Sequence, residues 1–82
     1  MSIYLGVHKF PKGTKNTDIQ KSWEMYKKSA DKMGLRTINA VVNGEMGLAY
    51  CFTEAESADQ VHKAHSDANV PIENVIEVSN LT

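Results

Sequence analysis

Only a few side chains in this 82-residue chain can bind a transition metal or activate a substrate. They are the imidazoles of His8, His62 and His65 and the thiol of Cys51. Imidazole and thiolate are borderline-to-soft donors that favour Zn, Ni, Cu or Fe over Ca or Mg. Carboxylates and phenols that could assist them belong to Asp67, Glu45, Tyr4, Tyr26 and Tyr50. The chemistry to consider is therefore metal coordination, or catalysis by histidine and cysteine.

Four segments are predicted to form strands. Residues 3–10 are predicted to form the first strand, which ends at Pro11-Lys12-Gly13. Strand alternation places two sets of side chains on opposite faces: Ile3, Leu5 and Val7 on one, and Tyr4, His8 and Phe10 on the other. Arg36–Val42 and Met46–Thr53 flank Asn43-Gly44. That dipeptide is typical of a hairpin with a type I′ turn, in which both central residues need positive φ. Asn74–Val78 predicts the last strand.

Two capping boxes predict the starts of two helices. Thr17-Asp18-Ile19-Gln20 opens a helix that Gly34 ends, and its apolar stripe consists of Ile19, Trp23, Tyr26, Ala30 and Met33. Ser57-Ala58-Asp59-Gln60 opens a shorter helix in the region that Pro71 ends, with a stripe of Val61, Ala64, His65 and Ala68. Each stripe follows the helical period, so we expect both helices to pack on the sheet.

The order strand–helix–strand–strand–helix–strand is the ferredoxin-like pattern, an α+β sandwich with a four-stranded antiparallel sheet. Residues 1–82 are predicted to form a single domain. A core of this size is small, and the usual remedies are a ligand, a metal or a partner subunit. Helices on one face would leave Tyr4 and Phe10 facing water on the other. We therefore expect a homodimer that packs sheet against sheet, as in a dimeric α+β barrel.

The predicted topology brings the candidate ligands together. The first and third strands form the central pair of a ferredoxin-like sheet, so His8 and Cys51 can lie close, and His65 is on the sheet-facing stripe of the second helix. His62 lies about 100° from Val61 around that helix and is predicted to be a solvated flank. A structural role is the alternative to a functional site. A lone histidine on an apolar stripe is more often a half-buried core residue, and cysteine often packs as a small hydrophobic residue. No closed ligand motif such as Cys-x-x-Cys is present.

The composition argues against nucleic-acid-binding and membrane-spanning proteins. The formal net charge is -1, which gives no electrostatic footprint for DNA or RNA. No apolar run approaches the roughly 18 residues of a membrane span. The first residues carry no basic and apolar leader, and a single cysteine fits a reducing compartment, so we expect a cytoplasmic protein. The expected partners are a second copy and a metal or small molecule, without nucleic acid or membrane.

Four segments carry a family resemblance: Gly6-Val7-His8, Leu48–Ala55, Val61–His65, and Pro71 with Ile76-Glu77-Val78. They resemble a family of small bacterial ferredoxin-like proteins, long catalogued as a domain of unknown function, that includes a dimeric nickel-binding protein. The resemblance implies the dimeric α+β fold and a site for Ni²⁺ or a related divalent ion. By position, the chain's counterparts of the family's His, Cys and His are His8, Cys51 and His65.

One departure from the family concerns the first helix. The family commonly carries His and Asp three residues apart there, and this chain has Trp23 and Tyr26. The loss of those polar groups would either remove metal binding or convert the site into a pocket for an organic ligand.

Two functions follow as hypotheses. The first is a metal-binding protein for sequestration or delivery, with nickel as the ion and His8, His65 and Cys51 as ligands. The second is a cofactor-independent enzyme or small-ligand binder, similar to monooxygenases and isomerases of the dimeric α+β barrel type. There, His8 or His65 would be the general base and a tyrosine the hydrogen-bond donor, in a cavity lined by Trp23, Tyr26 and Tyr50. In a third, purely structural interpretation, His and Cys only pack.

Overall fold

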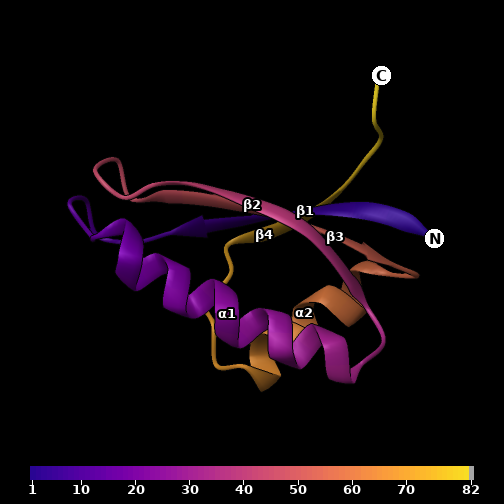
Figure 1. Cartoon of the computed structure of the whole chain (residues 1–82). Helices are drawn as coiled ribbons and strands as arrows, with labels where there is room; N and C mark the ends of the chain where they lie inside the picture. The colour runs from indigo at the N-terminus through magenta and orange to yellow at the C-terminus, as the bar shows by residue number, and fades with distance from the viewer. Residues whose placement is uncertain (82) are drawn as a thin grey trace.

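The protein is a four-stranded antiparallel sheet with two helices on one of its faces (Figure 1). The computed structural model describes residues 1–81, so Thr82, the last residue of the predicted domain, lies outside the described part. Strand order in the sheet is β2-β3-β1-β4, with β1 and β3 as the central pair. The elements are β1 (Ser2–Lys9), α1 (Asn16–Lys32), β2 (Arg36–Asn43), β3 (Leu48–Ala55), α2 (Ala58–Asp67) and β4 (Asn74–Val78). The predicted ferredoxin-like order is confirmed. Over residues 1–81, no helix is long and apolar enough to cross a membrane.

The hydrophobic core lies between the sheet and the helices. The predicted stripe of α1 contributes Tyr26 and Ala30, and that of α2 contributes Val61 and Ala64. Burial of these apolar surfaces is the main source of folding free energy. The buried residues of the core cluster are Tyr4, Tyr26, Ala30, Leu35, Cys51, Ala55, Val61, Ala64 and Val70, and Ile19 and Ala49 are buried as well.

The alternation of β1 is as predicted, but the assignment of its two faces is wrong. Tyr4, which we expected to face water, is only 7% exposed and belongs to the core under the helices. Phe10 lines a cavity on the same side. The open face instead carries Ile3, Leu5 and Val7, which are all partly buried by their neighbours in the sheet. Since both sets of alternating residues are apolar, alternation alone could not distinguish the covered face from the open one.

The helix ends depend on local hydrogen bonds. The Ser57 cap is confirmed, because the Ser57 hydroxyl accepts from the Gln60 amide at 3.4 Å. The Thr17 capping box is wrong: α1 begins at Asn16 after an N-cap at Lys15 that makes no side-chain hydrogen bond. Thr17 is therefore already inside the helix. At the other end Gly34 stops α1 as predicted, with φ at 74°.

The β2–β3 connection is a four-residue loop rather than the predicted two-residue type I′ turn. Asn43 pairs with Leu48, and Gly44 to Gly47 form the loop. The Phe10 amide donates to the Gly47 carbonyl at 2.8 Å, and the Gly13 amide donates to the Gly44 carbonyl at 2.9 Å. These bonds join the hairpin to the β1–α1 loop, and they explain why the local Asn-Gly preference is overridden.

Gly47 is constrained in this junction both by its backbone conformation and by its neighbours. Its φ is 72°, and a Cβ there would collide with the Phe10 carbonyl oxygen. Gly13 is a matched control, because it has φ at 87° but open space around the Cβ position. Positive φ alone costs a non-glycine residue about 1–2 kcal/mol. In urea unfolding, Gly47→Ala should therefore destabilise the protein by clearly more than Gly13→Ala, and equal losses would contradict this account.

Candidate metal centre

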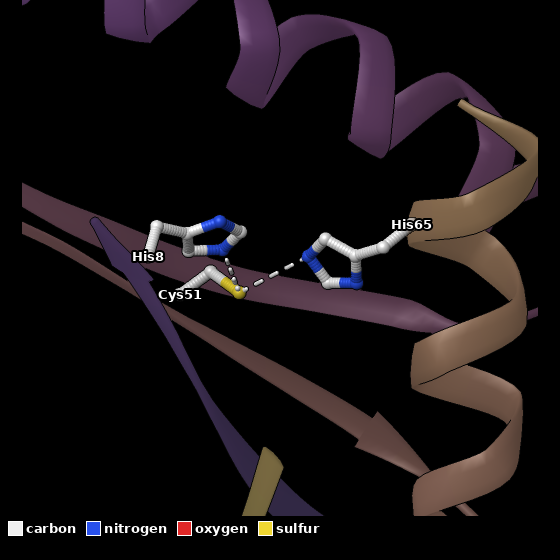
Figure 2. A group of neighbouring side chains, drawn as sticks. All are labelled: His8, Cys51 and His65. Atoms are coloured by element: carbon white, nitrogen blue, oxygen red, sulfur yellow. Dashed lines mark hydrogen bonds between the residues drawn. The ribbon is translucent and has the colours of Figure 1, made fainter. Parts of the chain in front are cut away.

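Three donor atoms from three separate elements meet beneath the helices (Figure 2). His8 is on β1, Cys51 on β3 and His65 on α2. The His8 Nε2 atom lies 3.4 Å from the Cys51 Sγ atom, which lies 3.7 Å from His65 Nε2. One ligand atom of each residue lies within 4.8 Å of the others. All three residues are buried, His65 to 1% exposure. The structure thus brings together the three residues that the sequence singled out.

The register of the central strand pair places the first two donors. Gly6 is directly opposite Cys51, and His8 is two residues further along the same face of β1. A Cβ on Gly6 would lie 2.6 Å from the Cys51 Sγ atom, so only glycine leaves room for the thiol. Gly6 is not among the residues predicted for the site from the sequence, although glycine inside a strand often marks a close approach.

The C-terminal end of α2 positions the histidine of the helix and also reaches the one on the strand. Asn69 adopts φ of 58°, the left-handed conformation that commonly ends a helix. The Val70 amide then donates to the His65 carbonyl at 2.9 Å. The next residue is Pro71, whose carbonyl accepts a hydrogen bond from His8 Nδ1 at 2.9 Å. The sequence suggested only that Pro71 ends the helical region. In the structure its carbonyl also orients the His8 ring.

Both imidazoles are held in the same tautomer. His8 Nδ1 donates to the Pro71 carbonyl, and His65 Nδ1 donates to the Val61 carbonyl at 2.7 Å. Because a carbonyl can only accept, each Nδ1 carries the proton and each Nε2 presents a lone pair. Both lone pairs face the Cys51 sulfur, whose thiol has one proton and can satisfy only one of them. An ion held by all three atoms would satisfy the set completely.

The two sulfur–nitrogen separations fit a transition metal. Bonds of about 2.0–2.1 Å to nitrogen and 2.3 Å to sulfur imply ligand separations of about 3.1 Å at right angles and about 3.6 Å at tetrahedral angles. The observed Sγ–Nε2 distances of 3.4 and 3.7 Å are close to this range. Hydrogen bonds from the distal ring nitrogen to backbone carbonyls are also the usual support of metal-bound histidine. The residues present therefore fit such an ion.

Burial keeps all three groups neutral in the metal-free protein. It lowers the pKa of His65 to about 4, although the hydrogen bond to Val61 acts in the opposite direction. It also lowers the pKa of His8. Burial raises the pKa of the Cys51 thiol to about 11. A protonated thiol is a poor nucleophile, so the arrangement does not favour a Cys–His catalytic pair, whereas neutral imidazoles are ready to ligate.

Tyr26 and Trp23 cover the site from α1. The Tyr26 ring stacks on the His65 ring with centroids 3.7 Å apart and an angle of 19° between planes. Its hydroxyl is hydrogen-bonded to Thr53, and burial raises the pKa of Tyr26 to about 12. Trp23 lies next to Tyr26, with ring centroids 5.9 Å apart. Tyr26 thus occupies one side of His65 and holds that ring in place.

A cavity of about 310 Å³ lies between α1 and the sheet. All three residues predicted to line a pocket, Trp23, Tyr26 and Tyr50, border it. Tyr50 lies between two residues of β3 that face the helices, so strand alternation directs its ring to the opposite face. His8 and Cys51 also border the cavity. The donor cluster is therefore accessible from this space.

The remaining candidates lie elsewhere. His62 is exposed, as the helical period predicted. Asp67 is also exposed, with its carboxylate 3.4 Å from the Lys63 ammonium, and Glu45 is exposed in the β2–β3 loop. Tyr4 is a core residue. Within residues 1–81, the cluster of donor residues contains no carboxylate.

The low pKa of His65 predicts a loss of stability in mild acid. The unfolded chain binds a proton at this residue near pH 6.5, before the folded chain does, so the free energy of unfolding falls as pH drops from about 6.5 towards 4. In metal-free protein, the NMR signals of the His65 ring should show neutral imidazole at pH 5.5. In urea the same ring should titrate near its ordinary value. Titration of the folded protein near 6.5 would contradict this prediction.

Comparisons with known proteins agree with the fold and identify a family. The family model of the nickel responsive protein SCO4226-like group matches residues 4–78. The crystal structure of SCO4226 from Streptomyces coelicolor A3(2) is similar with a TM-score of 0.87 and 18% identity, and the match covers 99% of this chain and 100% of that one. No curated protein sequence matches. Because the family match spans most of its length, this chain belongs to the SCO4226-like family of nickel responsive proteins.

Proposed function

We propose that this protein binds a divalent transition metal for sequestration or delivery, and that nickel is the preferred ion. The observation that carries the proposal is the convergence of two imidazole lone pairs and one sulfur atom at 3.4 and 3.7 Å. The family description as nickel responsive supports the identity of the ion. A mixed nitrogen and sulfur donor set is also one that Ni²⁺, Zn²⁺ and Cu ions prefer over Ca²⁺ or Mg²⁺.

The protein would contribute three ligands and a defined protonation change. His8 and His65 bind through Nε2 while their Nδ1 protons stay on the backbone carbonyls of Pro71 and Val61. Cys51 binds as the thiolate, so its proton leaves when the sulfur ligates. All three donors are buried, which suits retention of an ion. Positions not filled by these residues are open to water from the cavity.

Metal titrations of single variants test this proposal. His65→Ala and Cys51→Ala should each lower the affinity for Ni²⁺ at least tenfold, because each removes one ligand. His62→Ala is the matched control on the same helix, since its side chain is exposed, and it should bind as tightly as wild type. Isothermal titration calorimetry in two buffers of different ionisation enthalpy should show about one proton released per ion for wild type and none for Cys51→Ala.

The outcome that contradicts the proposal is equally specific. Wild type that binds no transition metal, or that binds it equally well without His65 or Cys51, rules out this site. Circular dichroism of each metal-free variant separates a lost ligand from a lost fold.

The second candidate function is a cofactor-independent enzyme or small-ligand binder. The cavity favours it, because aromatic side chains line it and His8 borders it. His8, rather than His65, would then be the general base, since the cavity lining includes only His8 of the two. This function requires that metal-free protein bind an organic substrate and that Cys51→Ala remain active.

We also propose that a second copy of the chain covers the open face of the sheet. Strand register brings together apolar residues of all four strands there, including Leu5 beside Phe52 and Ile76. Val41 and Ile76 are 49% and 43% exposed in the single chain. An apolar surface of this kind is typical of an interface, and a symmetric pair would enlarge a small core. The cytoplasm stays the expected location.

A charge at the centre of that face should separate the copies. Leu5→Glu would bury a carboxylate in the interface, so light scattering after size exclusion should show a dimer for wild type and a monomer for the variant. Met25→Glu is the matched control, because Met25 is 49% exposed on α1, on the other side of the molecule, and should stay dimeric. A monomeric wild type would contradict the proposal.

A further inference from the structure

The cavity between α1 and the sheet reaches the donor cluster from one side. Its lining includes His8 and Cys51 and excludes His65, whose ring is covered by Tyr26. An ion bound by the three donors would therefore have protein on the His65 side and open space on the other. Its remaining coordination positions would face a volume of about 310 Å³.

The walls of this space suit a small aromatic molecule. The rings of Phe10, Trp23 and Tyr26 border it together with the aliphatic side chain of Ile19. Polar side chains of α1 also line it, namely Asn16, Gln20, Ser22 and Glu24. The volume is at the lower end of the range for small-molecule sites, about 300–1,000 Å³. A ligand with one ring and a polar group matches both the size and the lining.

Charge decides the nature of that polar group. A divalent ion, one thiolate and two neutral imidazoles sum to a net charge of +1, and an uncompensated charge in an apolar site is costly. Within the described residues the cluster contains no carboxylate that could balance it. Glu24, the acidic residue of the cavity lining, is paired with Lys27 at 4.0 Å and half exposed. A monoanionic ligand would make the centre neutral.

We propose that the cavity binds a small aromatic carboxylate whose oxygen completes the coordination of the ion held by His8, Cys51 and His65. This inference rests on the proposed metal site and names its second ligand. The carboxylate would replace water on the cavity side, and the ring would lie among Phe10, Trp23 and Tyr26. Formation of this ternary complex involves no covalent chemistry.

Benzoate is the probe that tests the proposal, and benzamide is its neutral isostere. Trp23 is the only tryptophan of the chain and borders the cavity, so its fluorescence reports occupancy. Nickel-loaded wild type should bind benzoate at least tenfold more tightly than metal-free protein does, and at least tenfold more tightly than it binds benzamide. Absorption bands of the thiolate–nickel chromophore should shift on addition of benzoate and stay unchanged with benzamide.

A cavity variant separates the ligand site from the metal site. Ala40 borders the cavity opposite Cys51 on edge strand β2 and is exposed, so a larger side chain fits there without repacking the core. Ala40→Phe should lower benzoate affinity at least tenfold and change nickel affinity less than threefold.

The outcomes distinguish this inference from the proposed function. Tight nickel binding with equal benzoate affinity in loaded and metal-free protein overturns the carboxylate ligand and leaves the metal site in place. Equal binding of benzoate and benzamide does the same. Absence of nickel binding overturns both proposals. These comparisons use wild-type protein, so they decide the question even if Ala40→Phe does not fold.

Discussion

Two hydrogen bonds from imidazole Nδ1 atoms to backbone carbonyls determine what the centre of this protein can do. Each of them fixes both the orientation of a ring and the nitrogen that carries its proton. His8 depends on Pro71, and His65 depends on Val61. With the protons committed to the backbone, two lone pairs remain beside one thiol that cannot satisfy both. The geometry therefore has the character of a ligand set rather than of ordinary core packing.

The fold supplies these acceptors through helix α2 and its C-terminal turn. Val61 lies one turn before His65 on the same face, which is the spacing at which a side chain reaches a preceding carbonyl. Asn69 then reverses the chain, and this places the Pro71 carbonyl above β1. Gly6 keeps the space between the strand pair open for the sulfur atom. Helix, turn and strand each contribute one part of the same arrangement.

The sequence predicted the order of the elements and the residues of the cluster, because these depend on patterns with a known period. The stripe of α2 placed His65 against the sheet, and the central position of the first and third strands placed His8 near Cys51. The acceptors could not be predicted, since backbone carbonyls carry no residue-type signal. The face of β1 was assigned wrongly because both of its alternating sets are apolar. The β2–β3 loop differs from the predicted two-residue turn because its backbone hydrogen bonds with Phe10 and Gly13 outweigh the Asn-Gly preference.

The separation of the donors along the chain links this centre to folding. His8 and Cys51 are 43 residues apart, and the carbonyl that orients His8 is 63 residues away from it. Until β1 packs against the connection between α2 and β4, the chain has none of this geometry. A ligand that needs all three atoms therefore binds the native state and not the unfolded ensemble. By mass action, each tenfold rise of its free concentration above the dissociation constant adds about 1.4 kcal/mol to the free energy of unfolding. A small domain with little core would gain stability in this way wherever such a ligand is abundant.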